Sequence, residues 1–198
     1  MAASNPFPKP EYDGAAFESL SAGQIRLAER YFMRCTFRGV TFEKTKFVEC
    51  QLEECTFGDC AFVLPEWKGM HLRAVRFRGC KFVGLEMNTD AINPVLADFS
   101  FTDCRFVSCA FTGIPLPKAG FSGCRFSDCR FAQCDLSGAT FNGALFENTP
   151  FSDCTLTGTD FRNAGGFLID PRDNRLKGAK FTAGNALDLR TPLLDIIE

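Results

Sequence analysis

Residues 121–146 read FSGCRFSDCRFAQCDLSGATFNGALF, and every fifth residue of this stretch is Phe or Leu. The same spacing of large apolar residues extends from Phe17 to Phe161, with one change of frame between Ile92 and Phe101. A period of five fits neither an amphipathic helix, which needs about 3.6 residues, nor a simple strand, which needs about 2. The chain is therefore a repeat protein whose backbone turns between short segments.

A longer period of twenty residues indicates how the backbone turns. Leu116, Leu136, Leu156 and Leu176 follow one another at this spacing, and the position five residues after each of them is Phe. Twenty residues thus make one coil with four short sides, each of which places one large residue inside. Coils stacked at the roughly 4.8 Å spacing of paired strands bring like side chains into ladders. The sequence predicts an all-β, square-sectioned solenoid of about eight coils.

The cysteines follow the same repeat, because all eleven lie two residues before a large apolar position. Other coils hold small or β-branched residues in this slot, so we expect it to point into the corners of the core. Cysteines five residues apart fall on different sides of a coil and cannot converge on one zinc ion. Pairs twenty residues apart, such as Cys60 and Cys80, would stack within reach of a disulfide. Their odd number and the lack of a secretory signal favour buried, reduced thiols without metal or cofactor.

Several units resemble a known family. CRFSD at residues 124–128, ATFNG at 139–143 and TDFRN at 159–163 are similar to the A(D/N)LXX-type repeats of pentapeptide-repeat proteins, and such units cover about three quarters of the chain. The resemblance implies a right-handed quadrilateral β-helix. The length of 198 residues, the 23 Phe, the 11 Cys and the ending resemble the Qnr-type quinolone-resistance and albicidin-immunity proteins of bacteria. That subfamily implies a homodimer joined through its C-terminus, which binds DNA gyrase or topoisomerase IV as a DNA mimic.

The repeat divides the chain into five segments. They are an N-terminal tail (1–16), a first stack (17–92), an irregular coil (93–100), a second stack (101–182) and a C-terminal cap and dimerisation tail (183–198). Phe7 and Tyr12 are in phase with the repeat and are candidates to cover the first coil. Joining the two frames takes twenty-four residues, which predicts a coil expanded by four around Asn93 and Pro94. This kink is either a harmless bend or a loop that shapes a partner surface.

The C-terminal end departs from the repeat after Phe181. Apolar residues there predict a short helix and, past Pro192, an extended tail that caps the last coil or crosses to a second chain. The predicted dimer interface comprises Leu187, Leu189, Leu193, Leu194, Ile196 and Ile197.

The motifs of enzymes are missing from the sequence. His71, the single histidine, falls in an outward slot, and no phosphate-binding loop or dinucleotide fingerprint is present. No stretch approaches 18 apolar residues and no signal peptide is visible. We therefore expect a cytoplasmic protein without enzyme activity.

The outward residues predict a binding function. DNA mimicry requires a strongly negative surface. The net charge is only −2, and residues 17–92 carry 10 acidic and 11 basic residues, whereas residues 93–164 carry 7 acidic and 5 basic residues. The sequence thus supports mimicry for part of the rod only. The candidate partner-binding residues are Asp98, Asp103, Asp128, Asp153, Asp160, Arg73, Arg76 and Arg78.

An alternative function is a scaffold for another partner, which would contact the kink or the basic cluster between Lys68 and Lys81. We do not expect direct binding of nucleic acid.

Overall fold

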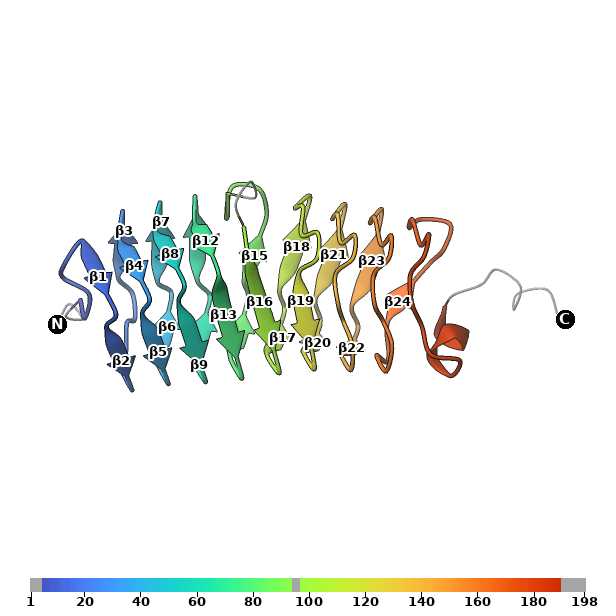
Figure 1. Cartoon of the computed structure of the whole chain (residues 1–198), viewed down its shortest axis with the longest axis horizontal. Coiled ribbons are helices and arrows are strands. Elements are labelled where there is room, and N and C mark those ends of the chain that lie inside the picture. Colours follow the sequence, from blue (N-terminus) through green and yellow to red (C-terminus); the bar gives the residue numbers. More distant parts are fainter. Residues whose placement is uncertain (1–4, 94–96, 190–198) are drawn as a thin grey trace, which may run out of the picture.

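The structure, a computed structural model, describes residues 5–93 and 97–189. The chain winds into about eight four-sided coils that stack into a rod, with the first and last described coils at opposite ends (Figure 1). The predicted all-β solenoid is confirmed. Within the described residues, no helix is long and apolar enough to cross a membrane.

The strands form four faces, which we number in the order in which the chain meets them. Face 1 contains β1 (Glu11–Asp13), β4 (Tyr31–Met33), β8 (Gln51–Glu53) and β12 (His71–Arg73). Face 2 contains β2 (Ala16–Glu18), β5 (Thr36–Arg38), β9 (Thr56–Gly58), β13 (Val75–Arg78), β16 (Phe99–Thr102) and β19 (Gly120–Ser122). Isolated bridges continue both faces toward the C-terminus, through Pro115, Asp135 and Thr155 on face 1 and through Thr140 and Asp160 on face 2.

The other two faces differ in their continuity. Face 3 is one sheet of β6 (Thr41–Glu43), β10 (Ala61–Val63), β14 (Lys81–Val83), β17 (Arg105–Val107), β20 (Arg125–Ser127) and β22 (Leu145–Glu147). Face 4 contains β3 (Arg26–Ala28), β7 (Lys46–Val48), β11 (Glu66–Lys68), β15 (Glu86–Met87), β18 (Ala110–Thr112), β21 (Arg130–Ala132), β23 (Pro150–Ser152) and β24 (Leu168–Ile169). Its sheet is interrupted between β11 and β15.

The register of the parallel strands follows the repeat. Tyr12 pairs with Phe32, and Phe37 pairs with Phe57, so that neighbouring coils are offset by twenty residues. Between β13 and β16 the offset is twenty-four, since Phe77 pairs with Phe101. The predicted expansion by four residues is confirmed. The predicted kink comprises Asn93 and Pro94. Asn93 donates its N–H to the Met70 carbonyl oxygen at 2.8 Å, and Pro94 lies outside the described residues.

Stacked phenylalanine rings fill the rod from end to end. On face 3 the ring centroids of Phe82 and Phe106 are 4.9 Å apart at 8°, and those of Phe106 and Phe126 are 4.8 Å apart at 7°. Rings on adjacent faces meet edge to face, as Phe126 and Phe131 do at 69°. Both arrangements are favourable for aromatic pairs, and ring burial is the main stabilising contribution.

The corner cysteines supply hydrogen-bond donors to the coil. All eleven are buried and unbridged. The Cys55 thiol, for example, donates to the carbonyl oxygens of Phe32 at 3.3 Å and Glu53 at 3.4 Å. In the same slot Thr159 donates to the Leu136 carbonyl at 2.8 Å, and Asn174 donates to that of Phe151 at 3.0 Å. The slot therefore accepts small side chains, and the polar ones among them, Cys, Thr and Asn, are tolerated because they can donate to a buried carbonyl.

Both described ends of the rod are closed by side chains. Phe7 is fully buried against Phe17 and Phe32, with centroid distances of 5.0 and 5.7 Å. Regular coils already begin at β1, inside the predicted N-terminal tail of residues 1–16. At the other end Asn185 donates to the carbonyl oxygens of Phe161 at 2.7 Å and Ala164 at 2.8 Å.

The predicted C-terminal helix is a single 3₁₀ turn, Asn185–Asp188. Leu189 packs half-buried against the core. Four residues of the predicted dimer interface, Leu193, Leu194, Ile196 and Ile197, lie outside the described residues, as does the side chain of Leu187.

Candidate partner-binding surfaces

The predicted acidic residues do not share one surface. Asp103, Asp128 and Asp153 lie at the corners that follow faces 2, 3 and 4, respectively, and are therefore on three different edges of the rod. Their φ angles are 55°, 54° and 53°, in the left-handed region that Asp tolerates better than most residues. The left-handed backbone at the corners thus explains why Asp occurs at these three positions. The three carboxylates do not form a continuous acidic face.

Two other acidic candidates are paired with arginines. Arg76 Nη1 donates to Asp98 Oδ1 at 3.0 Å, which joins β13 to the segment before β16. Arg162 Nη2 donates to Asp160 Oδ2 at 2.7 Å, and this hydrogen bond holds the pKa of Asp160 below its usual value. These pairs are surface salt bridges, so each contributes little to stability, but each also reduces the negative potential that a partner would meet.

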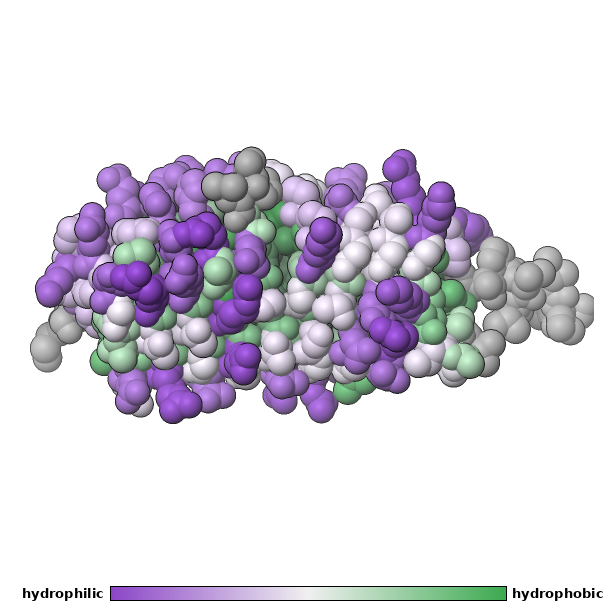
Figure 2. Space-filling model, viewed as in Figure 1, coloured by the Kyte–Doolittle hydropathy of each residue, from purple (hydrophilic) through white to green (hydrophobic). Residues whose placement is uncertain are grey.

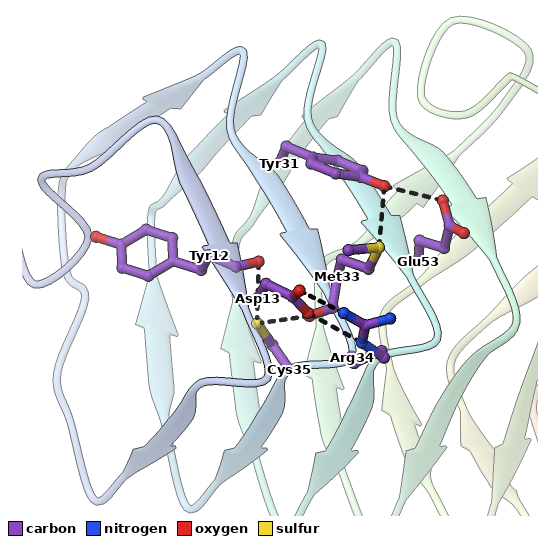
Figure 3. A network of polar contacts seen from close by, with 7 residues as sticks. All are labelled: Tyr12, Asp13, Tyr31, Met33, Arg34, Cys35 and Glu53. Atoms are coloured by element: carbon purple, nitrogen blue, oxygen red, sulfur yellow. Dashed lines mark hydrogen bonds and ion pairs between the residues drawn. The ribbon is translucent and has the colours of Figure 1, made fainter.

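A polar network crosses β1, β4 and β8 on face 1 (Figure 3). Arg34 Nε donates to Asp13 Oδ1 at 3.0 Å, and Tyr31 Oη donates to Glu53 Oε2 at 3.0 Å. The same Glu53 carboxylate forms an ion pair with Arg73, one of the predicted basic candidates. Each link joins neighbouring coils, so the network stabilises the stacking of the coils.

The basic cluster that the sequence suggests between Lys68 and Lys81 does not exist in space. Lys68 lies on face 4, Arg73 on face 1, Arg76 and Arg78 on face 2, and Lys81 on face 3. Residues five apart belong to adjacent faces, and closeness in the sequence therefore says little about closeness on this surface. Polar side chains are spread along the whole length of the rod in Figure 2.

The expanded coil creates two hollows. One, of about 590 Å³, lies where the face 4 sheet is interrupted, and Leu64, Trp67, Glu86 and Asp90 contribute to its lining. The other, of about 260 Å³, is lined by Ala97 to Phe99 and by Pro115 to Ala119. Residues 88–93 are held by the Asn88 side chain, whose Oδ1 accepts from the N–H groups of Asp90 at 3.0 Å and Ala91 at 2.9 Å. No group of three potential metal ligands occurs in residues 5–93 and 97–189.

We expect the native thiols to be unreactive near neutral pH. Burial raises the pKa of Cys55 to about 12, and the hydrogen bond that the Cys80 thiol donates to the stacked Cys104, together with burial, raises the pKa of Cys80 to about 12. The thiolate is the reactive species, and it is scarce when the pKa is this high. A thiol reagent such as DTNB should label no cysteine rapidly in the native protein and all eleven after unfolding in urea.

The same pKa shifts should make the fold sensitive to alkali. Thiols in the unfolded chain ionise near pH 8.5, whereas buried thiols with a raised pKa, such as Cys55 and Cys80, keep their protons in the native state, so stability is lost as the pH rises above about 8.5. The urea midpoint should therefore fall between mildly alkaline and strongly alkaline buffer. Rapid labelling of the native protein, or an unchanged midpoint, would contradict the burial of the thiols.

Comparisons with known proteins agree with this architecture. Residues 124–163 match the family model for pentapeptide repeats, in eight copies. The rod is similar to a trypsin-treated variant of QnrB1, a plasmid-mediated fluoroquinolone resistance protein, with a TM-score of 0.63 and 17% identity over 95% of this chain and 99% of that chain. HetL, a pentapeptide repeat protein involved in heterocyst differentiation regulation from the cyanobacterium Nostoc, has a TM-score of 0.44 and 14% identity over 87% of each chain. A search of curated proteins finds no match.

Proposed function

We propose that this pentapeptide-repeat protein is a non-catalytic rod that binds DNA gyrase or topoisomerase IV and protects the enzyme from fluoroquinolones. The observation that carries the proposal is the likeness to the fluoroquinolone resistance protein QnrB1, which extends over nearly the whole of both chains. The core supports a binding role, because the large residues and cysteines of the repeat are buried and leave only outward side chains for function. Such a partner places the protein in the cytoplasm.

The charge pattern favours a contact at the expanded coil over broad DNA mimicry. A DNA mimic must present regular negative charge to a basic groove. The described acidic candidates lie on separate edges or are paired with arginines, as Asp98 is with Arg76. The coil that includes residues 88–93 is wider than its neighbours (Figure 1), and Asn88 fixes its shape before any partner binds. A preorganised loop loses less conformational entropy on binding than a flexible one.

The test is a supercoiling assay with purified gyrase and ciprofloxacin. We expect the protein to restore supercoiling at a drug concentration that otherwise abolishes it. The variant Asp90→Ala, in the expanded coil, should weaken protection, whereas Asp59→Ala, at a corner of face 2, should not. If the protein neither forms a complex with gyrase or topoisomerase IV nor restores their activity, the proposal is wrong.

A second candidate function is that of a rod that binds a different partner. This alternative is favoured because the described acidic residues do not form a continuous face. Binding to gyrase without protection, or no binding, would support this alternative. In either case we propose a homodimer formed through the C-terminus, to which the half-buried Leu189 would contribute. Light scattering of the full chain, compared with a chain ending at residue 189, tests the dimer.

A further inference from the structure

Face 3 carries a file of three like charges on successive coils. Lys81 pairs directly with Arg105, and Arg105 pairs directly with Arg125, in the register of β14, β17 and β20. Paired strands lie about 4.8 Å apart, so these three cations emerge from the surface as close neighbours. All three side chains are exposed, and none makes an ion pair with another described residue.

This arrangement opposes stability. Like charges directly opposite each other on neighbouring strands repel and destabilise a sheet. Several stacked charges elsewhere on the rod are opposite, as in Lys46 and Glu66 at 2.8 Å and in the pair of Arg73 and Glu53. Arg26 also pairs directly with Lys46, but the ion pair between Lys46 and Glu66 on the next coil offsets that repulsion. Within residues 5–93 and 97–189, no other file places three like charges on successive coils. Unfavourable surface features that a fold does not need are typical of binding sites.

An apolar strip runs beside the cations. Val83 and Val107 lie on β14 and β17, the strands of Lys81 and Arg105, and Val63 lies on the neighbouring strand β10. The three valines are stacked and half-exposed. The two exposed large hydrophobic residues of the described chain border the same face: Leu145, 45% exposed, pairs with Arg125, and Leu64, 49% exposed, follows β10 at the corner.

Leu64 is also unusual in its backbone. Its φ of 48° is in the left-handed region, where an exposed leucine gains neither the steric freedom of Gly nor the local hydrogen bonds of Asn or Asp. The backbone position is required by the corner, but the large apolar side chain is not. Leu64 therefore adds to the apolar strip without serving the fold.

We propose that face 3 is a docking surface for a short acidic segment of a partner protein, which lies along the rod axis. Its carboxylates would contact Lys81, Arg105 and Arg125, and its apolar side chains would cover the valine strip and Leu64. Arginine in particular forms paired hydrogen bonds with carboxylates.

The boundaries of the patch favour a short protein segment over other anions. Glu43 follows the valine file directly at one end, and Glu147 lies beyond Ser127 at the other end, and both glutamates are exposed. They would repel a long polyanion such as DNA, or an anionic membrane, that extended past the three cations. A phosphate backbone also has no apolar groups that could cover the valine strip.

The file of three cations is separate from the contact proposed for gyrase, and only Leu64, at the corner after face 3, also lines the hollow beside the expanded coil. The expanded coil occupies face 1, between β15 and β16, and face 3 is on the opposite side of the square. One partner could therefore bind the expanded coil while the acidic segment occupies face 3.

The test uses a fluorescein-labelled peptide of alternating glutamate and leucine, with binding measured by anisotropy. The variant K81Q/R105Q/R125Q should bind the peptide at least about tenfold more weakly than the unmodified chain, and by more at low salt than at high salt. The matched control R26Q/R38Q/R130Q removes three exposed cations from faces 2 and 4 and should change the affinity by less than about twofold. Leu64→Asn, which keeps a residue suited to the corner, should also weaken binding.

Three results would overturn the proposal. They are the absence of peptide binding by the unmodified chain, an equal loss in the two triple variants, and tighter binding of short duplex DNA or phosphatidylserine vesicles with the same sensitivity to K81Q/R105Q/R125Q. Circular dichroism and urea unfolding distinguish binding from folding. Because the substitutions remove repulsion, K81Q/R105Q/R125Q should be at least as stable as the unmodified chain, and a lower stability would assign the file a structural role instead.

Discussion

Replacing Gly166 by alanine is expected to lower the free energy of unfolding by about 3 kcal/mol or more, a large share of the stability of a typical domain. Gly166 has a φ of 72°, and a Cβ at this position would overlap the carbonyl oxygen of Phe146. That oxygen belongs to the backbone of β22, which is fixed by the hydrogen bond from the Phe146 N–H to the Gly165 carbonyl at 2.9 Å. Relief of the overlap would therefore require the last coils to separate.

Gly143→Ala is the matched control. Gly143 has a similar φ of 69°, but a Cβ there would have no atom within 4 Å. Its alanine variant should lose only about 1 kcal/mol, the cost of the left-handed conformation. Urea unfolding followed by circular dichroism gives both values. Equal losses in the two variants would show that the overlap with Phe146 does not limit the packing of the last coils.

The inward half of each coil could be predicted from the sequence because a single steric rule governs it. A large residue must fill the space that the coil below leaves open, so the periodic Phe and Leu positions, and the expansion between Phe77 and Phe101, are visible in the spacing alone. The structure also explains the choice of residue in the corner slot, which the spacing does not reveal. A polar residue in the corner slot can donate to a buried carbonyl, and Thr159 can therefore replace Cys there.

The outward half could not be predicted in the same way. Arg73 and Arg76 are close in sequence but lie on different faces, whereas Lys81 and Arg125 are far apart in sequence and lie in one file. A signal for that file exists, because CKF at 80–82 and CRF at 104–106 and 124–126 recur at the coil spacing. Finding it requires counting residues through the expanded coil. The corner carboxylates, such as Asp103, resemble an acidic surface in the sequence only because their left-handed backbone is invisible there.

The second large effect is expected from Phe126→Ala, which should lower the free energy of unfolding by about 3–5 kcal/mol. Phe126 is 1% exposed, and its ring stacks between those of Phe106 at 4.8 Å and Phe146 at 5.1 Å. Coils contact only their neighbours along a solenoid, so a cavity at this position also weakens the coupling between the two parts of the rod. The single unfolding transition should then split in two, with a smaller slope for each part because each exposes less surface.

Phe17→Ala provides the comparison at the end of the rod. Phe17 is only partly buried and packs against the core from the first complete coil, with its ring stacked on Phe37 at 5.0 Å. Its removal should cost less than the loss of Phe126 and leave one transition, since only the terminal coil frays. Urea titrations followed by far-ultraviolet circular dichroism measure the cost and the slope together. If both variants lose the same free energy in a single transition, the rod unfolds as one cooperative body, and a partner bound at one coil would then stabilise the whole length.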